Sequence, residues 1–330
     1  MLINTKKYDH YKYDYIQFAK LGHKPKYISL SSKTAYDSYI ANLLKYESLS
    51  EKDDVFLIVP SIFNSPEILF LSGHKNFINN LRAQGKVYLI NWQETKVQLT
   101  IEDLVQELGA IIDFIKKTIT KKIHLIGHCI GGNICIALAQ NFHIGIKSLT
   151  LMNTPWDFSH FSNLKNIIES PEFKKIIKDR DLIPKIYVQI MFFLMYPAQY
   201  RKKINKYFTS SEPTKHLFMQ VEDWLQSGIS IPKSLYIQII DEFCLQNVTY
   251  NEKWIMDKSK VTLEKINIPT CIIYAKADQI VPYTSIVPLL KQIKTSTLIK
   301  VEGGHIGYLI KHQSHLEEKY NNWLENILAK

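Results

Sequence analysis

Short apolar runs recur along the first half of this chain. Residues 54–60, 86–92 and 123–127 carry apolar side chains at nearly every position, and residues 148–153 follow the same pattern. Continuous runs of this kind are typical of strands that are buried on both faces of a sheet. Residues 27–46, rich in aromatic and β-branched side chains, predict two further strands joined by a turn.

Amphipathic segments separate these apolar runs. Residues 101–119 place apolar side chains at helical spacing, with Thr100 as a helix cap, and a second helix is expected over residues 130–140. Because short buried strands alternate with helices, the sequence predicts the α/β class, with a mostly parallel, doubly wound sheet.

The alternation stops over residues 158–263, a helical and aromatic-rich interval, and resumes at residues 270–275 and 298–301. Since strands return on its far side, we interpret the interval as a helical cap inserted into one core. An aromatic cluster over residues 192–196 is typical of a lid that excludes water and lines an apolar channel. The predicted domains are a core over 1–157 and 264–330, with an amino-terminal extension over 1–25, and a cap over 158–263.

Composition narrows the class of protein. The 330 residues carry a formal net charge of +10, but the lysines are spread along the chain and no recognition motif accompanies them, so we expect no nucleic-acid binding. The amino terminus lacks the apolar run of a signal peptide, and the most apolar window, residues 183–197, is too short for a membrane span. The spacing of the four cysteines predicts neither disulfides nor zinc, which favours a cytoplasmic location.

The strongest chemical signal is the segment G-H-C-I-G-G over residues 127–132, between a predicted strand and a predicted helix. It matches the nucleophile-elbow pattern G-x-S-x-G, with Cys129 in the serine position. The tight turn presents the sulfur at the carboxyl end of the sheet, and the amino terminus of the following helix favours a thiolate. The main-chain N–H of Ile130 would point at a developing oxyanion. The competing interpretation is a buried structural cysteine.

A thiolate nucleophile needs a base and a group that orients the base, and hydrolase triads run nucleophile, acid, histidine along the chain. Asp278 follows the strand predicted over residues 270–275, and His305 follows the strand predicted over residues 298–301. Both therefore lie at carboxyl ends of strands, where ligands gather in open α/β sheets. The sequence predicts a catalytic set of Cys129, Asp278 and His305.

Three other residues compete for these roles. Asp157 also follows a strand and is a rival orienter, although its proline-aromatic setting is more typical of a structural turn. His128 neighbours the nucleophile, but an elbow aims adjacent side chains in different directions, so we interpret it as packing. His124 lies inside a predicted strand and is expected in the core.

At these residues the chain resembles polyhydroxyalkanoate synthases, which carry G-x-C-x-G-G in place of the serine elbow. The match extends to T-P-x-D-F at residues 154–158, D-x-x-V-P at 278–282 and G-H-I-G at 304–307. Residues 59–64 and 68–71 are similar to the family's proline-rich turn, its Ile-Asn and its Tyr-Ile-Leu-Asp-Leu segment. The chain length resembles the short catalytic subunit that works with a separate partner subunit.

The resemblance implies an α/β-hydrolase fold with an inserted helical cap, and polymerisation of 3-hydroxyacyl-CoA with release of CoA. The expected substrate is 3-hydroxybutyryl-CoA, the acceptor is the growing polyester chain, and no cofactor or metal is implied. A second synthase subunit, a homodimer and contact with the polymer-granule surface are compatible with the resemblance and stay open.

The same resemblance assigns roles residue by residue. Cys129 would be the acylated nucleophile, His305 its base, and Asp278 would help to activate the hydroxyl of the hydroxyacyl group. The oxyanion and substrate-binding positions would be Ile130, Phe63 and Asn64.

The chain departs from the family pattern at Gln279 in place of a histidine, Phe70 in place of an aspartate, and Ser61 in place of a proline. Two other functions therefore stay open. One is a cysteine hydrolase of the same fold, such as a polyester depolymerase, esterase or lactonase, because exclusion of water decides between transfer and hydrolysis. The other is a non-catalytic granule-associated protein.

Overall fold

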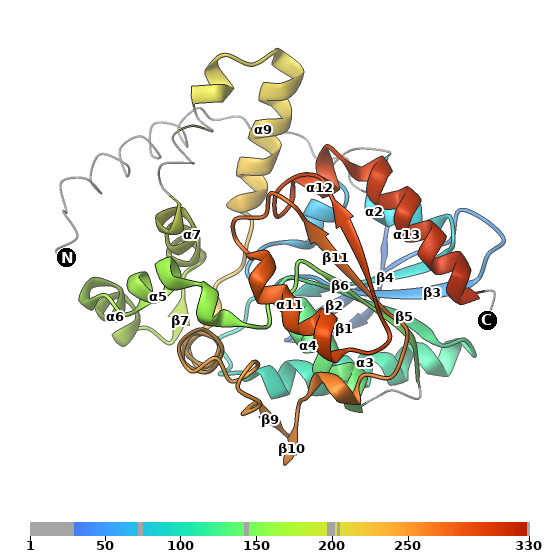
Figure 1. Ribbon diagram of the computed structural model, residues 1–330, viewed down its shortest axis with the longest axis horizontal. Helices are drawn as coiled ribbons and strands as arrows, with labels where there is room; N and C mark the ends of the chain where they lie inside the picture. Colours follow the sequence, from blue (N-terminus) through green and yellow to red (C-terminus); the bar gives the residue numbers. More distant parts are fainter. Residues whose placement is uncertain (1–29, 72–74, 142–144, 197–201, 203–204, 329–330) are drawn as a thin grey trace.

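Figure 1 shows the computed structural model of the chain, which describes residues 30–71, 75–141, 145–196, 202 and 205–328. The extension predicted over residues 1–25 lies outside these described residues. Within them, an eight-stranded central sheet has the strand order β1-β2-β4-β3-β5-β6-β11-β12. Its strands are β1 (Lys33–Asp37), β2 (Ala41–Tyr46), β3 (Asp54–Val59), β4 (Gly85–Trp92), β5 (Ile123–His128), β6 (Ile146–Met152), β11 (Thr270–Ala275) and β12 (Ser296–Val301).

Only the first edge of the sheet is antiparallel. β2 pairs with both β1 and β4 in antiparallel fashion, whereas the strands from β4 to β12 pair in parallel. β3 and β5 are buried along almost their whole length, as expected for strands covered on both faces. The prediction of a mostly parallel, doubly wound α/β sheet is confirmed.

Helices cover both faces of the sheet. On one face, α3 (Ile101–Thr118), α4 (Ile130–Asn141) and α11 (Tyr283–Gln292) pack into one apolar cluster. On the other, α2 (Phe77–Arg82) and α13 (Gln313–Leu328) pack into a second cluster. Thr100 caps α3 as predicted: its Oγ1 accepts from Asp103 N, and its own N–H donates to Asp103 Oδ2.

The interval from residue 158 to residue 263 adds no strand to the central sheet in the part of the chain that the structure describes. Figure 1 shows α5, α6, α7 and α9 grouped beside the sheet. The helices are α5 (Ser162–Ile168), α6 (Pro171–Lys178), α7 (Lys185–Met195), α9 (Glu212–Leu225) and α10 (Lys233–Gln238), with the π-helical η4 (Ile239–Leu245) and short 3-10 turns at either end, η3 (Phe158–His160) and η5 (Leu263–Lys265). Two short ladders join β7 (Leu182–Ile183) to β8 (Ile231–Pro232) and β9 (Ile255–Met256) to β10 (Ser259–Lys260). The limits of the cap as a domain stay a prediction.

Parallel strands bring their carboxyl ends to one edge of the sheet, and this arrangement positions the site. The loop after β3 leads into the short turn η1 (Pro66–Leu69), and the loop after β12 leads into the short helix α12 (Gly307–Ile310). Cys129 follows β5 and Asp278 follows β11 at the same edge. In the described residues, no helix is both long and apolar enough to cross a bilayer.

Candidate active site

Cys129 occupies a strained turn between β5 and α4. Its φ angle is +53°, a left-handed conformation that residues other than glycine adopt rarely. The turn is held because Cys129 N donates to Met152 O at 2.9 Å, and Gly132 N donates to Cys129 O at 2.9 Å. The side chain is 7% exposed. A strained, tethered backbone that carries a nucleophile is the geometry of a nucleophile elbow.

The two glycines after the elbow are required by close approach of the backbone. A Cβ on Gly131 would lie 2.3 Å from Val59 O, and a Cβ on Gly132 would lie 1.9 Å from Thr154 Oγ1. No side chain fits at either position without displacing a strand end or its neighbour. The doubled glycine of the sequence motif thus has a steric cause.

His305 joins the predicted acid to the predicted nucleophile. Its Nδ1 lies 2.7 Å from Asp278 Oδ2, and the Cys129 side chain lies close enough to its ring to raise the pKa of the imidazole. The other carboxylate oxygen, Asp278 Oδ1, accepts from Ile280 N at 2.8 Å and Val281 N at 2.9 Å. Asp278 is therefore fixed by its own turn, and it in turn orients the imidazole. The structure brings all three predicted residues together.

Electrostatics favour the protonated imidazole. Burial lowers the pKa of His305, but the charge of the Asp278 carboxylate, the hydrogen bond between them and the Cys129 side chain together raise that pKa to about 10. A cationic imidazole between a carboxylate and a cysteine sulfur stabilises a thiolate at that sulfur. The site is thus arranged as an acid, an imidazolium and a nucleophile.

This raised pKa predicts a pH-dependent contribution to stability. The stabilisation is complete below the unfolded-state pKa of about 6.5 and is lost as the pH rises through the folded-state pKa of His305, because the folded chain holds that proton more tightly. We expect His305→Gln to be less stable than the wild type near pH 6, and the difference to shrink towards about pH 10. Urea unfolding across this range measures it, with the exposed His216→Gln as the control. A difference that stays constant or grows would contradict the charge assignment.

The predicted oxyanion donors lie on two sides of the elbow. Ile130 is the first residue of α4, where a main-chain N–H has no partner within its own helix. Phe63 N donates to Ser61 Oγ, but the contact is long, at 3.4 Å, so this N–H can turn to a stronger acceptor. The side chain of Asn64 donates to Leu225 O at 3.3 Å. Asn64 thus contacts the end of α9 and also lines the cavity described next.

A cavity of about 420 Å³ adjoins His305, within the range of small-molecule sites. Its wall combines loops at the sheet edge with α7 and α9, and Phe63 packs edge-on against Phe192 of α7 with ring centroids 5.7 Å apart. Most of the wall is apolar, with a few polar groups. Besides His305, the residues that line it include Phe192, Phe193, Tyr196, Gln189, Glu222 and Gln279.

The rival residues have other roles. Asp157 Oδ1 accepts from Ser159 N at 2.9 Å and from Asn247 Nδ2 at 2.8 Å, and its Oδ2 faces His160, so this carboxylate closes a turn of its own. His124 is fully buried at the far end of β5 and bonds Ser148 Oγ at 2.8 Å. In the part of the chain that the structure describes, neither side chain hydrogen-bonds or forms an ion pair with His305.

Sequence reasoning missed one hydrogen bond that holds the His305 loop, and it expected His128 only as a packing residue. Asn153 Nδ2 donates to His305 O at 3.0 Å, and its Oδ1 accepts from Ala275 N at 2.9 Å, so this side chain ties β11 to the histidine loop. The centroid of the His128 ring lies 5.3 Å from that of the His305 ring. Burial first, and then the charge of His305, lower the pKa of His128 to about 3. Asn153 could have been found from the sequence because it lies at the end of the strand predicted next after the one that leads into the elbow.

The other cysteines are chemically quiet. Cys135, Cys244 and Cys271 are free and buried, and burial raises the pKa of each thiol, to about 12 at Cys244. Thiols held protonated in this way are poor nucleophiles. Within the described residues, no cluster of three or more histidine, cysteine or acidic side chains could hold a metal ion.

Comparison with known proteins places the chain in a family. Residues 97–311, which include the elbow, Asp278 and His305, match the sequence profile described as the alpha/beta hydrolase fold. The chain belongs to the α/β-hydrolase fold family. Among solved α/β hydrolases, MenH from S. aureus superposes with a TM-score of 0.58 at 15% identity, covering 87% of this chain and 98% of that one. A bacterial membrane phospholipase A superposes with a TM-score of 0.55 at 14% identity, over 91% of this chain and 87% of its own. These likenesses support the fold.

Curated relatives within this fold family carry one name. The poly(3-hydroxyalkanoate) polymerase subunit PhaC of Haloferax mediterranei is 26% identical over 86% of this chain and 61% of its own length. That of Haloarcula marismortui is 24% identical over 87% of this chain and 65% of its own length. That of Synechocystis is 26% identical over 81% of this chain and 76% of its own. The resemblance to polyhydroxyalkanoate synthases is confirmed, although this chain spans less than two thirds of the first two relatives.

Proposed function

We propose that this chain is an acyltransferase of the poly(3-hydroxyalkanoate) polymerase type. It would transfer 3-hydroxyacyl groups from CoA thioesters, through a thioester on Cys129, onto the hydroxyl end of a growing polyester. The observation that carries the proposal is the connected set of Cys129, His305 and Asp278 beside a mostly apolar cavity. The relatives' shared name supports the choice of substrate.

The first half-reaction loads the enzyme. The Cys129 thiolate attacks the thioester carbonyl, and the main-chain N–H groups of Ile130 and Phe63 hold the oxyanion that develops. The bond from the carbonyl carbon to the CoA sulfur breaks, and His305 gives its proton to the departing CoA thiolate. One thioester replaces another, so the step costs little free energy.

The second half-reaction extends the polymer. The hydroxyl of a hydroxyacyl group attacks the Cys129 thioester, a carbon–oxygen bond forms, and the bond to the Cys129 sulfur breaks. The neutral His305 takes the hydroxyl proton, and Asp278 stabilises the resulting imidazolium. The largely apolar wall around His305 would keep water from competing with the hydroxyl.

The connected catalytic set argues against a non-catalytic granule protein, since a decayed site need not keep its acid and base 2.7 Å apart. A second synthase subunit, a homodimer and contact with a polymer granule belong to the proposal through the resemblance alone, and a cytoplasmic location belongs to it through the spacing of the cysteines. Gln279 follows Asp278 in the chain and lines the cavity, and among the described residues it makes no hydrogen bond to His305.

The proposed function is tested by incubating the protein with 3-hydroxybutyryl-CoA while both free CoA and polyester are measured. We expect CoA to be released in step with the formation of polyester, because the acyl-enzyme is consumed by a hydroxyl group and not by water. Release of CoA with only free 3-hydroxybutyrate would instead identify a cysteine hydrolase. If neither CoA nor polyester forms, even when the concentration of protein exceeds the detection limit for CoA, acyl transfer from this substrate would be rejected.

A further inference from the structure

The loop after β3, residues 61–65, carries the proposed oxyanion donor and contacts one segment of the interval between β6 and β11. Trp224 Nε1, near the end of α9, donates to Ser65 O at 2.7 Å. In the opposite direction, Asn64 Nδ2 donates to Leu225 O at 3.3 Å. Two hydrogen bonds therefore tie the carboxyl end of α9 to this loop.

The backbone of the same segment touches the donor residue itself. Gly228 is buried, and a Cβ built on it would lie 2.3 Å from Phe63 O and 3.3 Å from Phe63 C. The neighbour here is backbone, which cannot give way as a flexible side chain does. Beyond Gly228, Ser230 N donates to Glu94 Oε2 at 2.8 Å, which anchors the segment to the chain after β4.

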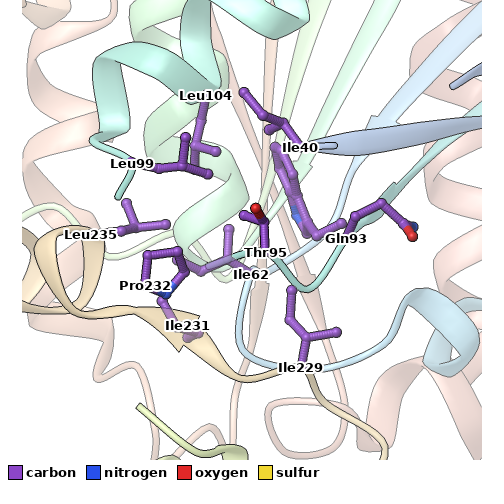
Figure 2. Close-up of a pocket in the computed structure, with 11 residues that line it drawn as sticks. Ile40, Ile62, Gln93, Thr95, Leu99, Leu104, Ile229, Ile231, Pro232 and Leu235 are labelled. Carbon is purple, nitrogen blue, oxygen red and sulfur yellow. The ribbon is translucent and has the colours of Figure 1, made fainter. Parts of the chain in front are cut away.

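A third contact is apolar. Figure 2 shows Ile62 next to Pro232 and Ile231 in a small cavity, with Ile229 nearby. The cavity holds about 20 Å³, room for about one water molecule and too little for a substrate group. Ile62, directly before Phe63, is thus packed against the segment and is 3% exposed.

From within, the loop restrains its donor weakly, because the bond from Phe63 N to Ser61 Oγ is 3.4 Å long. An oxyanion donor acts only when it is held about 2.7–3.1 Å from the position of the developing charge. We propose that residues 224–231 position the Phe63 N–H for the oxyanion, with Trp224 and Gly228 as positioning residues. This inference rests on the proposed acyl transfer at Cys129, and it links the placement of α9 to stabilisation of the transition state.

Two reactions of Cys129 separate this role from general damage to the site. With p-nitrophenyl butyrate, the thiolate attacks a carbonyl, an oxyanion forms and p-nitrophenolate leaves as the Cys129 thioester is made. With iodoacetamide, the thiolate displaces iodide from a CH₂ group and no oxyanion forms. Neither reaction requires CoA or a polymer, so failure of the polymerase proposal leaves this test intact.

Gly228→Ala is the main variant. We expect its rate of acylation by p-nitrophenyl butyrate to fall about 100-fold, the loss typical of one oxyanion donor, with little change in KM. Alkylation by iodoacetamide should continue at the wild-type rate. The matched control is Gly145→Ala, where the new Cβ would meet only the flexible Lys116 side chain, at 3.2 Å or more, and both rates should stay unchanged.

Trp224→Phe keeps the aromatic packing and removes the indole N–H, so it tests the positioning without a steric clash. We expect acylation to fall by about tenfold, the scale of one hydrogen bond, with alkylation unchanged. The control is Trp254→Phe, a tryptophan that is 2% exposed and packs against Trp156 and Phe243. Equal loss of acylation and alkylation in Gly228→Ala and Trp224→Phe, or no loss of acylation in either, would overturn the inference.

Discussion

Cys129→Ala should release no CoA from 3-hydroxybutyryl-CoA above the uncatalysed rate. Among the described residues, Cys129 is the one cysteine beside the His305 imidazole, and burial raises the pKa of the other three thiols. None of these three thiols is therefore suited to accept the acyl chain. Loss of the nucleophile in a serine protease costs about 10⁶ in kcat, which sets the scale of the expected effect.

The matched control is Cys135→Ala. Cys135 is free, fully buried and lies on α4, the helix that follows the elbow, so this change tests the loss of a thiol in the same region. It should retain CoA release, because the Cys135 thiol is kept protonated by burial. If Cys129→Ala released CoA as fast as Cys135→Ala, another group would carry the acyl chain.

Asp278→Asn should separate loading from elongation. The amide keeps the shape of the carboxylate. In one orientation its N–H points towards His305, and in the other it loses the backbone hydrogen bonds that Asp278 Oδ1 accepts. In both orientations the charge that raises the pKa of His305 is removed. A cysteine can ionise without this help, since a free thiol has a pKa near 8.5. Attack by a hydroxyl needs a positioned base, and the equivalent change in a serine protease costs about 10⁴ in rate.

A rapid-mixing assay of CoA release measures this separation. For Asp278→Asn we expect a burst of about one CoA per site, followed by turnover slowed by about 10³–10⁴. Asp157→Asn is the control, because that carboxylate closes the turn at η3 and makes no hydrogen bond to His305 in the described structure. This variant should keep both burst and turnover. Loss of the burst in Asp278→Asn, as complete as in Cys129→Ala, would show that Asp278 is needed for loading as well.

The sequence was sufficient to predict the sheet and the proximity of Cys129, Asp278 and His305, because both rest on local patterns. Buried strands appear in the sequence as continuous apolar runs. The elbow requires small residues because the backbone passes close by: a Cβ on Gly131 would lie 2.3 Å from Val59 O. Because the strands are parallel, the residues that directly follow them lie at the same edge of the sheet. Asp278 and His305 follow from that rule alone.

The contacts that support the set were not predictable in this way, because they join residues far apart in the chain. Trp224 contacts Ser65 across 159 positions, and nothing in the local sequence of α9 marks that partner. The same holds for Asn153, which bonds His305 across 152 positions. The hydrogen bond from Phe63 N to Ser61 Oγ is local, but the direction of the Phe63 N–H depends on the distant residues that hold the loop.

Detection of the acyl-enzyme is the measurement that tests the central claim most directly. The protein is mixed with 3-hydroxybutyryl-CoA, quenched in acid within the first turnover, digested and examined by mass spectrometry. We expect the peptide that contains Cys129 to carry a 3-hydroxybutyryl group that hydroxylamine removes, as it does from thioesters. CoA release with Cys129 unmodified throughout, and with the acyl group on another residue or on none, would contradict the account.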